Sequence, residues 1–177
     1  PGTRCALEHG GVAPVIIAKD ADLDDAVSRV AKGGFYHAGQ VCVSVQRVFC
    51  DESIVDVFAD KLAGAAANLR VGDPTDSATE VGPLISEKEC QRVADWVTEA
   101  TEGGAIIKTG GKRLSDSCYE PTVLMGAHRD AKISTSEVFG PVVSIYPYKK
   151  IDDAIGQANS LPVSFQSAVF TESLETA

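Results

Sequence analysis

The chain has 177 residues, of which 44% are hydrophobic and 23% charged, and its formal net charge is -9 at pH 7. A chain of this length can form one domain with a real core, burying roughly 70% of its unfolded surface. The acidic balance, without a cluster of lysine or arginine, excludes a nucleic-acid-binding protein, and no apolar run approaches the ~20 residues of a membrane span.

The cysteines and histidines indicate a reducing compartment and predict no metal site. The five cysteines are odd in number and form no Cys-X-X-Cys pair, which excludes a regular disulfide framework. The three histidines, His9, His37 and His128, lack the spacing of metal ligands. Because no secretory signal opens the sequence, a soluble, cytoplasmic protein is expected.

The first half of the chain predicts strands alternating with amphipathic helices. In chain order these are a strand at 15–18, a helix from Leu23, a turn at 37–40, a strand at 46–50 and a helix from Ile54. Asp22 and Ser53 are expected to cap the two helices, because a side-chain oxygen at the N-cap accepts N–H groups of the first turn.

The second half continues the alternation. Its expected elements are a helix after Ser86, a strand at 105–108, a turn-rich excursion at 110–118, strands at 122–125 and 142–148, a short helix at 151–158 and a strand at 168–170. Ser86 and Glu89 have the spacing of a capping box. The alternation predicts an α/β fold in which helices flank a largely parallel, open sheet, formed as one domain.

Three short segments carry the candidate chemistry. Leu7-Glu8-His9-Gly10-Gly11 holds a carboxylate that could act as a base, and Gly39-Gln40-Val41-Cys42 holds a thiol that could act as a nucleophile. The third segment is Glu137-Val138-Phe139-Gly140-Pro141. In this order and separation, the three segments resemble those of the aldehyde dehydrogenase superfamily, and the resemblance runs from about residue 4 to residue 170.

The resemblance makes Cys42 the catalytic nucleophile. A planar aldehyde is a poor hydride donor, whereas addition of a thiolate produces a tetrahedral thiohemiacetal that can expel hydride and become a thioester. The backbone N–H of Cys42 is implied as one donor to the oxyanion. Without the resemblance, a lone cysteine is more often a small buried hydrophobic residue.

The resemblance also makes Glu8 the base that activates water to hydrolyse the thioester. Members of the family that pass the acyl group to coenzyme A lack this glutamate, so its presence favours hydrolysis. Glu137 is implied to bond the hydroxyls of the nicotinamide ribose, and Phe139 to lie against the nicotinamide region. The implied cofactor is NAD or NADP, and the implied substrate is a small-molecule aldehyde.

Residues 1–177 are expected to form the nucleophile-bearing catalytic domain of an aldehyde dehydrogenase. Family members are much longer, so the dinucleotide-binding domain and a second oxyanion donor are expected to lie outside this chain. The full-length protein is expected to be a homo-oligomer, a dimer or a tetramer, as is usual in the family.

Some positions depart from the family pattern. His9 stands where leucine is common and His37 where asparagine is common, and Pro162 to Phe165 replace a Tyr-Gly-Leu type of segment. His37 could stabilise the Cys42 thiolate as a cation, although a solvent-facing turn residue is the simpler interpretation.

Two other functions compete with the dehydrogenase interpretation. The first is a non-catalytic assembly domain or a pseudoenzyme relative of the family, which would use its surfaces for oligomerisation. The second is a hydrolase that pairs Cys42 with His37, but such an enzyme explains neither Glu8 nor the segment around Glu137.

Overall fold

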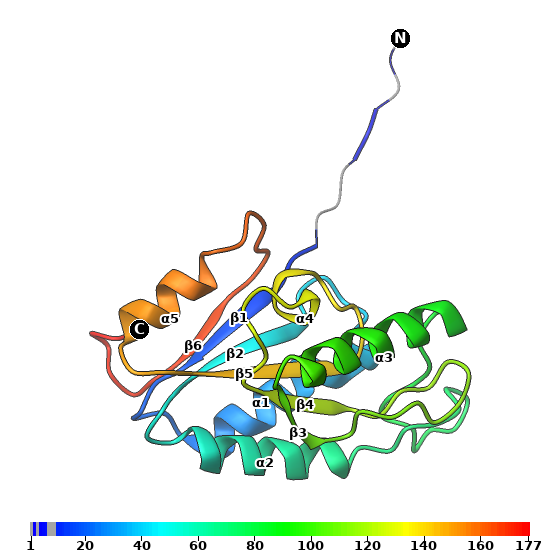
Figure 1. Cartoon of the computed structure of the whole chain (residues 1–177), viewed down its shortest axis with the longest axis horizontal. Helices are drawn as coiled ribbons and strands as arrows, with labels where there is room; N and C mark the ends of the chain where they lie inside the picture. Colours follow the sequence, from blue (N-terminus) through cyan, green and yellow to red (C-terminus); the bar gives the residue numbers. More distant parts are fainter. Residues whose placement is uncertain (1, 3, 7–9) are drawn as a thin grey trace.

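The computed structural model describes residues 2, 4–6 and 10–177, and in these residues the strands form a single six-stranded sheet. The strands are β1 (Ala13–Ile17), β2 (Val45–Asp51), β3 (Ile106–Thr109), β4 (Thr122–Met125), β5 (Val142–Tyr148) and β6 (Ala168–Phe170). Their order across the sheet is β3-β4-β5-β2-β1-β6 (Figure 1). Every neighbouring pair is parallel except β3 and β4, which confirms the largely parallel sheet.

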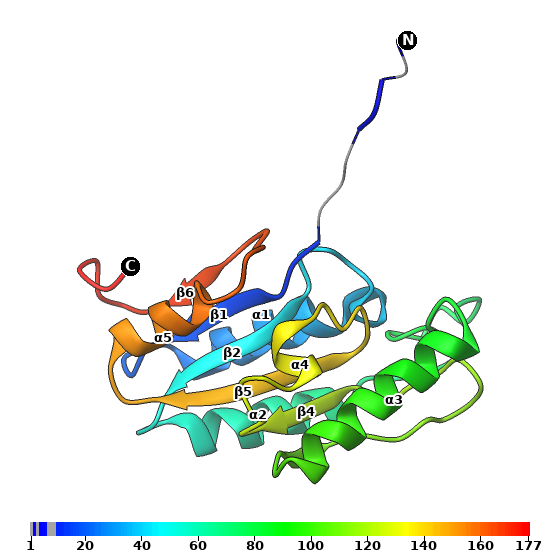
Figure 2. The same ribbon diagram turned by 45° about the horizontal axis from the view of Figure 1, so that its top comes forward.

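Helices cover both faces of the sheet. They are α1 (Leu23–Phe35), α2 (Val55–Ala67), α3 (Glu87–Glu102), α4 (Lys132–Thr135) and α5 (Ile151–Ala158), with a short 3-10 helix at Tyr36–Gly39. In Figures 1 and 2, α1 and α2 lie on one face, and α3, α4 and α5 lie on the other. Helical crossovers between parallel strands, which are right-handed as a rule, lead to this three-layer arrangement.

The central strands are buried on both faces, which explains their nearly continuous apolar sequences. All five residues of β1 are buried, as are six of the seven residues of β5. The inner sides of the helices add aromatic and aliphatic residues that are almost completely buried, among them Phe35, Phe58 and Leu62. Two polar residues, Gln46 and Arg47, also lie in this interior, on β2.

The strands predicted at 122–125, 142–148 and 168–170 are confirmed at both ends, and the others differ by one or two residues. Asp22 caps α1 as expected, accepting hydrogen bonds from the N–H groups of Asp24 and Asp25 at 2.9 and 3.1 Å. The one-turn helix α4 was not predicted, because four residues give no helical periodicity.

Two capping predictions need correction. Ser53 does not cap α2, which starts after Ile54 without a side-chain cap; its N–H and hydroxyl both bond to Asp51 Oδ1, at 2.9 and 2.5 Å. This aspartate turn competes locally with capping. At α3, Ser86 accepts the N–H of Glu89, but the Glu89 carboxylate pairs with Arg92, so only half of the capping box forms.

The described residues contain neither a membrane-spanning helix nor a cluster of metal ligands. No helix among them has the length and apolar character needed to cross a membrane. No group of three or more His, Cys, Asp or Glu side chains among them is placed to hold a metal ion.

The caps give a stability prediction with a matched control. Asp22→Ala should lower the free energy of unfolding by about 1 kcal/mol, because two N–H groups of α1 lose their acceptor. Ser53→Ala should change it by less than about 0.5 kcal/mol, since Ser53 caps no helix. Urea unfolding of the two variants and the wild type measures both values. Equal losses would contradict the assignment of Asp22 as a cap.

Candidate active site

Cys42 follows a turn with an unusual backbone. After α1, the residues His37, Ala38 and Gly39 have φ values of 51°, 55° and 69°. Residues other than glycine rarely adopt this left-handed backbone conformation. Each one that does raises the free energy of the folded chain by on the order of 1–3 kcal/mol. Cys42 is half-buried in the short stretch between this turn and the start of β2. Strain of this kind persists only where the surroundings hold it, which is typical of functional sites.

Gly39 allows the turn before Cys42 to pack directly on the turn that contains Glu137. A Cβ atom at position 39 would overlap the carbonyl group of Gly140. Glycine is therefore required at Gly39 for two reasons, its positive φ and the absence of a side chain. This contact brings together two of the three predicted segments, which are about a hundred residues apart in the sequence.

The Gln40 side chain holds the turn before Cys42 from the other side. Its Nε2 donates to the carbonyl oxygens of His37 and Pro83, both at 3.2 Å, and its Oε1 accepts the N–H of Ile85 at 2.9 Å. Both N–H groups of the carboxamide are thus used, and its oxygen has a donor. The glutamine of the Gly-Gln-X-Cys segment therefore ties the turn to the loop that leads into α3.

The second turn presents Glu137 and Phe139. Phe139 has a φ of 48°, and the residue is 41% exposed, an unusual state for a large aromatic residue. The Arg92 guanidinium of α3 donates to the Val138 carbonyl oxygen at 2.6 Å, which fixes the backbone between the two side chains. The strained backbone thus directs an aromatic ring outward, where a ligand can reach it.

The glycine pair at Gly10 and Gly11 approaches the Glu137 carboxylate. The N–H of Gly11 donates to Glu137 Oε1 at 3.3 Å, and a Cβ atom at position 10 would overlap the same carboxylate. A hollow of about 250 Å³ adjoins this contact and is lined by Gly10, Gly11, Val12, Thr135, Glu137, Leu161, Pro162 and Val163. A half-buried carboxylate beside a hollow can accept hydroxyl groups of a bound ligand.

Residues 162–165, whose sequence departs from the family pattern, pack over the glycine pair. A Cβ atom at Gly11 would lie 3.1 Å from the Phe165 nitrogen and 3.2 Å from the Ser164 Cα. Gly11 is therefore enclosed between this segment and Glu137. The backbone of the segment makes the contact, so its unusual side chains are compatible with the site.

Glu8 and His9 lie outside the described residues, so the geometry of the candidate base stays a prediction. His37 is described: its side chain is exposed, and its ring lies 5.1 Å from the Tyr36 ring, centroid to centroid. Among the described residues, no hydrogen bond joins His37 to Cys42. This placement supports the solvent-facing interpretation of His37.

The other cysteines have surroundings unlike that of Cys42. Cys50 and Cys90 are buried, and burial raises the pKa of both thiols, that of Cys50 to about 12. Since the thiolate is the nucleophilic form, both should be inert near neutral pH. Cys118 is half-buried, and Cys5 is exposed near the start of the chain. None of the four lies on the two turns.

Three residues at the site were not predicted from sequence: Gln40, Gln46 and Arg47. The Arg47 guanidinium is buried and donates to the carbonyl oxygens of Val12, Gln157 and Ala158 at 3.1–3.3 Å. It joins the segment after the glycine pair to the last turn of α5. The sequence did contain a signal for Gln46 and Arg47: two adjacent polar residues stand in a strand that was predicted to be buried. Buried polar groups need hydrogen-bond partners, so both side chains could have been expected to hold neighbouring segments.

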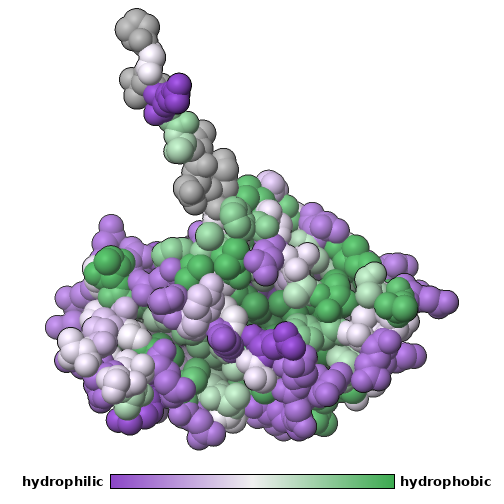
Figure 3. Space-filling model, turned by 180° about the vertical axis from the view of Figure 1, so that it is seen from behind, coloured by the Kyte–Doolittle hydropathy of each residue, from purple (hydrophilic) through white to green (hydrophobic). Residues whose placement is uncertain are grey.

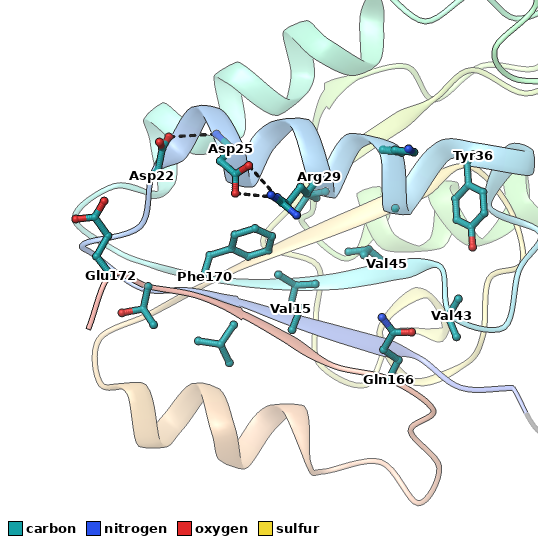
Figure 4. A pocket seen from close by; sticks show the side chains of 16 residues that line it. Val15, Asp22, Asp25, Arg29, Tyr36, Val43, Val45, Gln166, Phe170 and Glu172 are labelled. Carbon is teal, nitrogen blue, oxygen red and sulfur yellow. Dashed lines mark hydrogen bonds and ion pairs between the residues drawn. The ribbon is translucent and has the colours of Figure 1, made fainter. Parts of the chain in front are cut away.

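A larger cavity lies elsewhere in the described part of the chain. It has a volume of about 730 Å³ and lies between α1 and the strands β1 and β6 (Figure 4). Asp25 and Arg29 form an ion pair on its α1 side, and Tyr36 and Val43 lie at its other end. Cys42, Glu137 and Phe139 do not line it. Figure 3 shows the molecule from behind, and the face seen there has hydrophobic surface in its middle, bordered by polar groups.

Comparisons with known proteins agree on one family. The sequence model of the aldehyde dehydrogenase family matches residues 1–177. The 3-sulfolactaldehyde dehydrogenase of Priestia aryabhattai is 42% identical over 174 residues, which cover 98% of this chain and 36% of that protein. Succinate-semialdehyde dehydrogenase 1 of Mycobacterium tuberculosis, whose name specifies NADP(+), is 42% identical over 167 residues, 93% of this chain and 36% of that protein.

Solved structures show the same fold. The crystal structure of glyceraldehyde-3-phosphate dehydrogenase from Methanocaldococcus jannaschii, complexed with NADP, matches with a TM-score of 0.90 and 40% identity. The match covers 94% of this chain and 36% of that chain. This chain therefore spans about a third of the length of the proteins it resembles.

The contact between the two turns predicts a large effect at Gly39. Gly39→Ala should lower the free energy of unfolding by more than about 2 kcal/mol, because the added methyl group meets both a positive φ and the Gly140 carbonyl. It should also change the rate at which iodoacetamide alkylates Cys42.

Gly64→Ala is the matched control. Gly64 lies inside α2, and a Cβ atom there would have no neighbour within 4 Å. Alanine should therefore stabilise the chain by about 0.5–1 kcal/mol. If Gly39→Ala unfolded at the same urea concentration as the wild type, the packing of the two turns would be wrong.

Proposed function

This chain belongs to the aldehyde dehydrogenase family, and we propose that it is the nucleophile-bearing domain of a dehydrogenase that oxidises an aldehyde to a carboxylic acid with NAD or NADP. One observation carries the proposal: the Cys42 turn packs on the turn that presents Glu137 and Phe139, and Gly11 bonds to the same carboxylate. These two contacts link the turn before Cys42, the Glu137 carboxylate and Gly11, which supports a shared site for the three segments.

The first step is addition of the Cys42 thiolate to the aldehyde. A bond forms between Sγ and the carbonyl carbon, and the π electrons move to oxygen, giving a tetrahedral thiohemiacetal. The backbone N–H of Cys42 stabilises the developing oxyanion. Gln40 and the packed Gly39 keep the turn rigid, so that this N–H and the thiolate keep their relative positions. When the oxyanion collapses, hydride leaves the carbon and a thioester to Cys42 remains.

The described residues fit the nicotinamide half of a dinucleotide. The Glu137 carboxylate borders the hollow next to the glycine pair, and Phe139 exposes an aromatic face. Glu137 would accept the ribose hydroxyls and Phe139 would lie against the nicotinamide region. When bound, the nicotinamide supplies the hydride acceptor. The rest of the cofactor would be held by a dinucleotide-binding domain, for which the longer relatives have the additional length.

The last step is hydrolysis of the thioester. Glu8 accepts a proton from water, the water oxygen attacks the thioester carbon, and the Cys42 thiolate leaves as the carboxylic acid forms. Thiolate and base are then ready for another cycle once Glu8 has released its proton. This role of Glu8 is supported by its place in the Leu-Glu-His-Gly-Gly segment.

The substrate is a small-molecule aldehyde, and the relatives indicate where to begin. The 3-sulfolactaldehyde and the succinate semialdehyde in their names are the first two compounds of an aldehyde panel. We place the full-length dehydrogenase in the cytoplasm as a homo-oligomer, a dimer or a tetramer, on the strength of the family resemblance. Aldehyde-dependent formation of reduced nicotinamide, without coenzyme A, tests the activity.

Cys42→Ser should abolish turnover in the full-length dehydrogenase, because a serine hydroxyl is far less ionised and far less nucleophilic than a thiol near neutral pH. The assay is absorbance of the reduced nicotinamide. Cys90→Ser is the control, since Cys90 is buried in α3 away from both turns, and it should retain activity. Turnover by Cys42→Ser would refute the assignment of the nucleophile.

Glu8→Gln should slow deacylation while leaving acylation intact, because an amide cannot take the proton of the attacking water. Rapid mixing with aldehyde and cofactor should then show a burst of about one reduced nicotinamide per site, followed by a slow steady state. A variant that shows no burst would indicate that Glu8 acts before the thioester forms.

A further inference from the structure

We propose that Gln46 is a positioning residue whose carboxamide sets the place of Glu137 relative to Cys42. The inference rests on the proposed function in one respect, the role of Glu137 toward the cofactor. Gln46 belongs to none of the three segments that resemble the family motifs. It lies on β2, four residues after Cys42, and is only 4% exposed.

The Gln46 carboxamide makes three hydrogen bonds, all to the backbone of the connection between β4 and β5, residues 126–141, which is called the loop below. Its Nε2 donates to the carbonyl oxygens of Ile133 at 2.9 Å and Ser136 at 2.7 Å, and its Oε1 accepts the N–H of Val138 at 2.9 Å. Both N–H groups and the oxygen of the carboxamide are therefore used. The bonds to Ser136 and Val138 flank Glu137 directly.

This arrangement fixes the backbone of Glu137 from β2, the strand that begins three residues after Cys42. The loop has little regular structure of its own, since α4 is one turn long and has no side-chain cap. Without Gln46, two carbonyl oxygens and one N–H of a buried loop would have no partner. The Glu137 carboxylate in turn accepts the N–H of Gly11, so the same carboxamide also governs the position of the glycine pair.

A purely structural role is the competing explanation, and Thr122 provides the control for it. Thr122 is also buried, and its hydroxyl accepts the N–H of Gly111 at 2.8 Å and donates to the Glu120 carbonyl oxygen at 2.7 Å. It lies on β4, and its side chain makes no hydrogen bond to either turn; its backbone N–H donates to the Pro141 carbonyl oxygen at 2.8 Å, a bond that a change of side chain leaves in place. Thr122→Val removes buried hydrogen bonds without touching the loop around Glu137.

Gln46→Met keeps the length and packing of the side chain but removes its hydrogen bonds. On this chain, amide hydrogen exchange at Val138 should become at least about tenfold faster in Gln46→Met, after correction for global unfolding, and should stay unchanged in Thr122→Val. This measurement needs no enzyme activity. The exchange rate therefore decides whether Gln46 holds the loop, whatever the result of the dehydrogenase assay. A wild-type protein without dehydrogenase activity would count against the proposed function alone.

In the full-length dehydrogenase, Gln46→Met should raise the KM for NAD or NADP at least about tenfold, while kcat changes by less than about threefold. Thr122→Val should change neither. Loss of stability alone would lower the amount of active enzyme and leave KM as it was. Unchanged Val138 exchange, or an unchanged cofactor KM in an active enzyme, would overturn the positioning role.

Discussion

The close approach of two backbone turns is the constraint on which the candidate site depends. Gly39 can touch the Gly140 carbonyl only because Gly39 has no side chain that would separate the turns. One turn continues to the thiol of Cys42, and the other presents the Glu137 carboxylate. A shift of about an ångström between such groups can cost two orders of magnitude in rate, so contact of rigid backbones is a suitable way to set their distance.

Backbone strain is concentrated at this contact. Within the described part of the chain, His37, Ala38 and Phe139 are the non-glycine residues with positive φ, and all three lie on the two turns. Conformations of this cost persist when neighbouring bonds compensate for them. Gln40 supplies bonds at the first turn and Gln46 at the second, in each case through a carboxamide whose donors are fully used.

β2 connects the site to the core. Gln46 bonds to the loop around Glu137, and Arg47 bonds to the end of α5. The pairing of β1 with β2 shifts register between these two positions, from Ala13–Val45 to Pro14–Arg47. Both side chains bond to backbone atoms of segments that carry or support the site. The strand β2 is buried because of its apolar residues, and its two polar side chains also fix the backbone of the segments around the site.

Much of the fold follows from the sequence, because apolar runs and capping residues act locally. The strand at 142–148 and the cap at Asp22 were predicted correctly for that reason. Ser53 was mispredicted as a cap, because its preference for Asp51 depends on a turn geometry that residue type does not reveal.

The sequence by itself determined the class of fold and, through three short segments, which thiol and carboxylates to consider. Tertiary structure alone decided that Gly39 meets Gly140 and that Gln46 supports Glu137, because each pair lies about ninety or more residues apart in the sequence. Such contacts are set by how parallel strands stack side by side, and no local pattern encodes which loops then become neighbours.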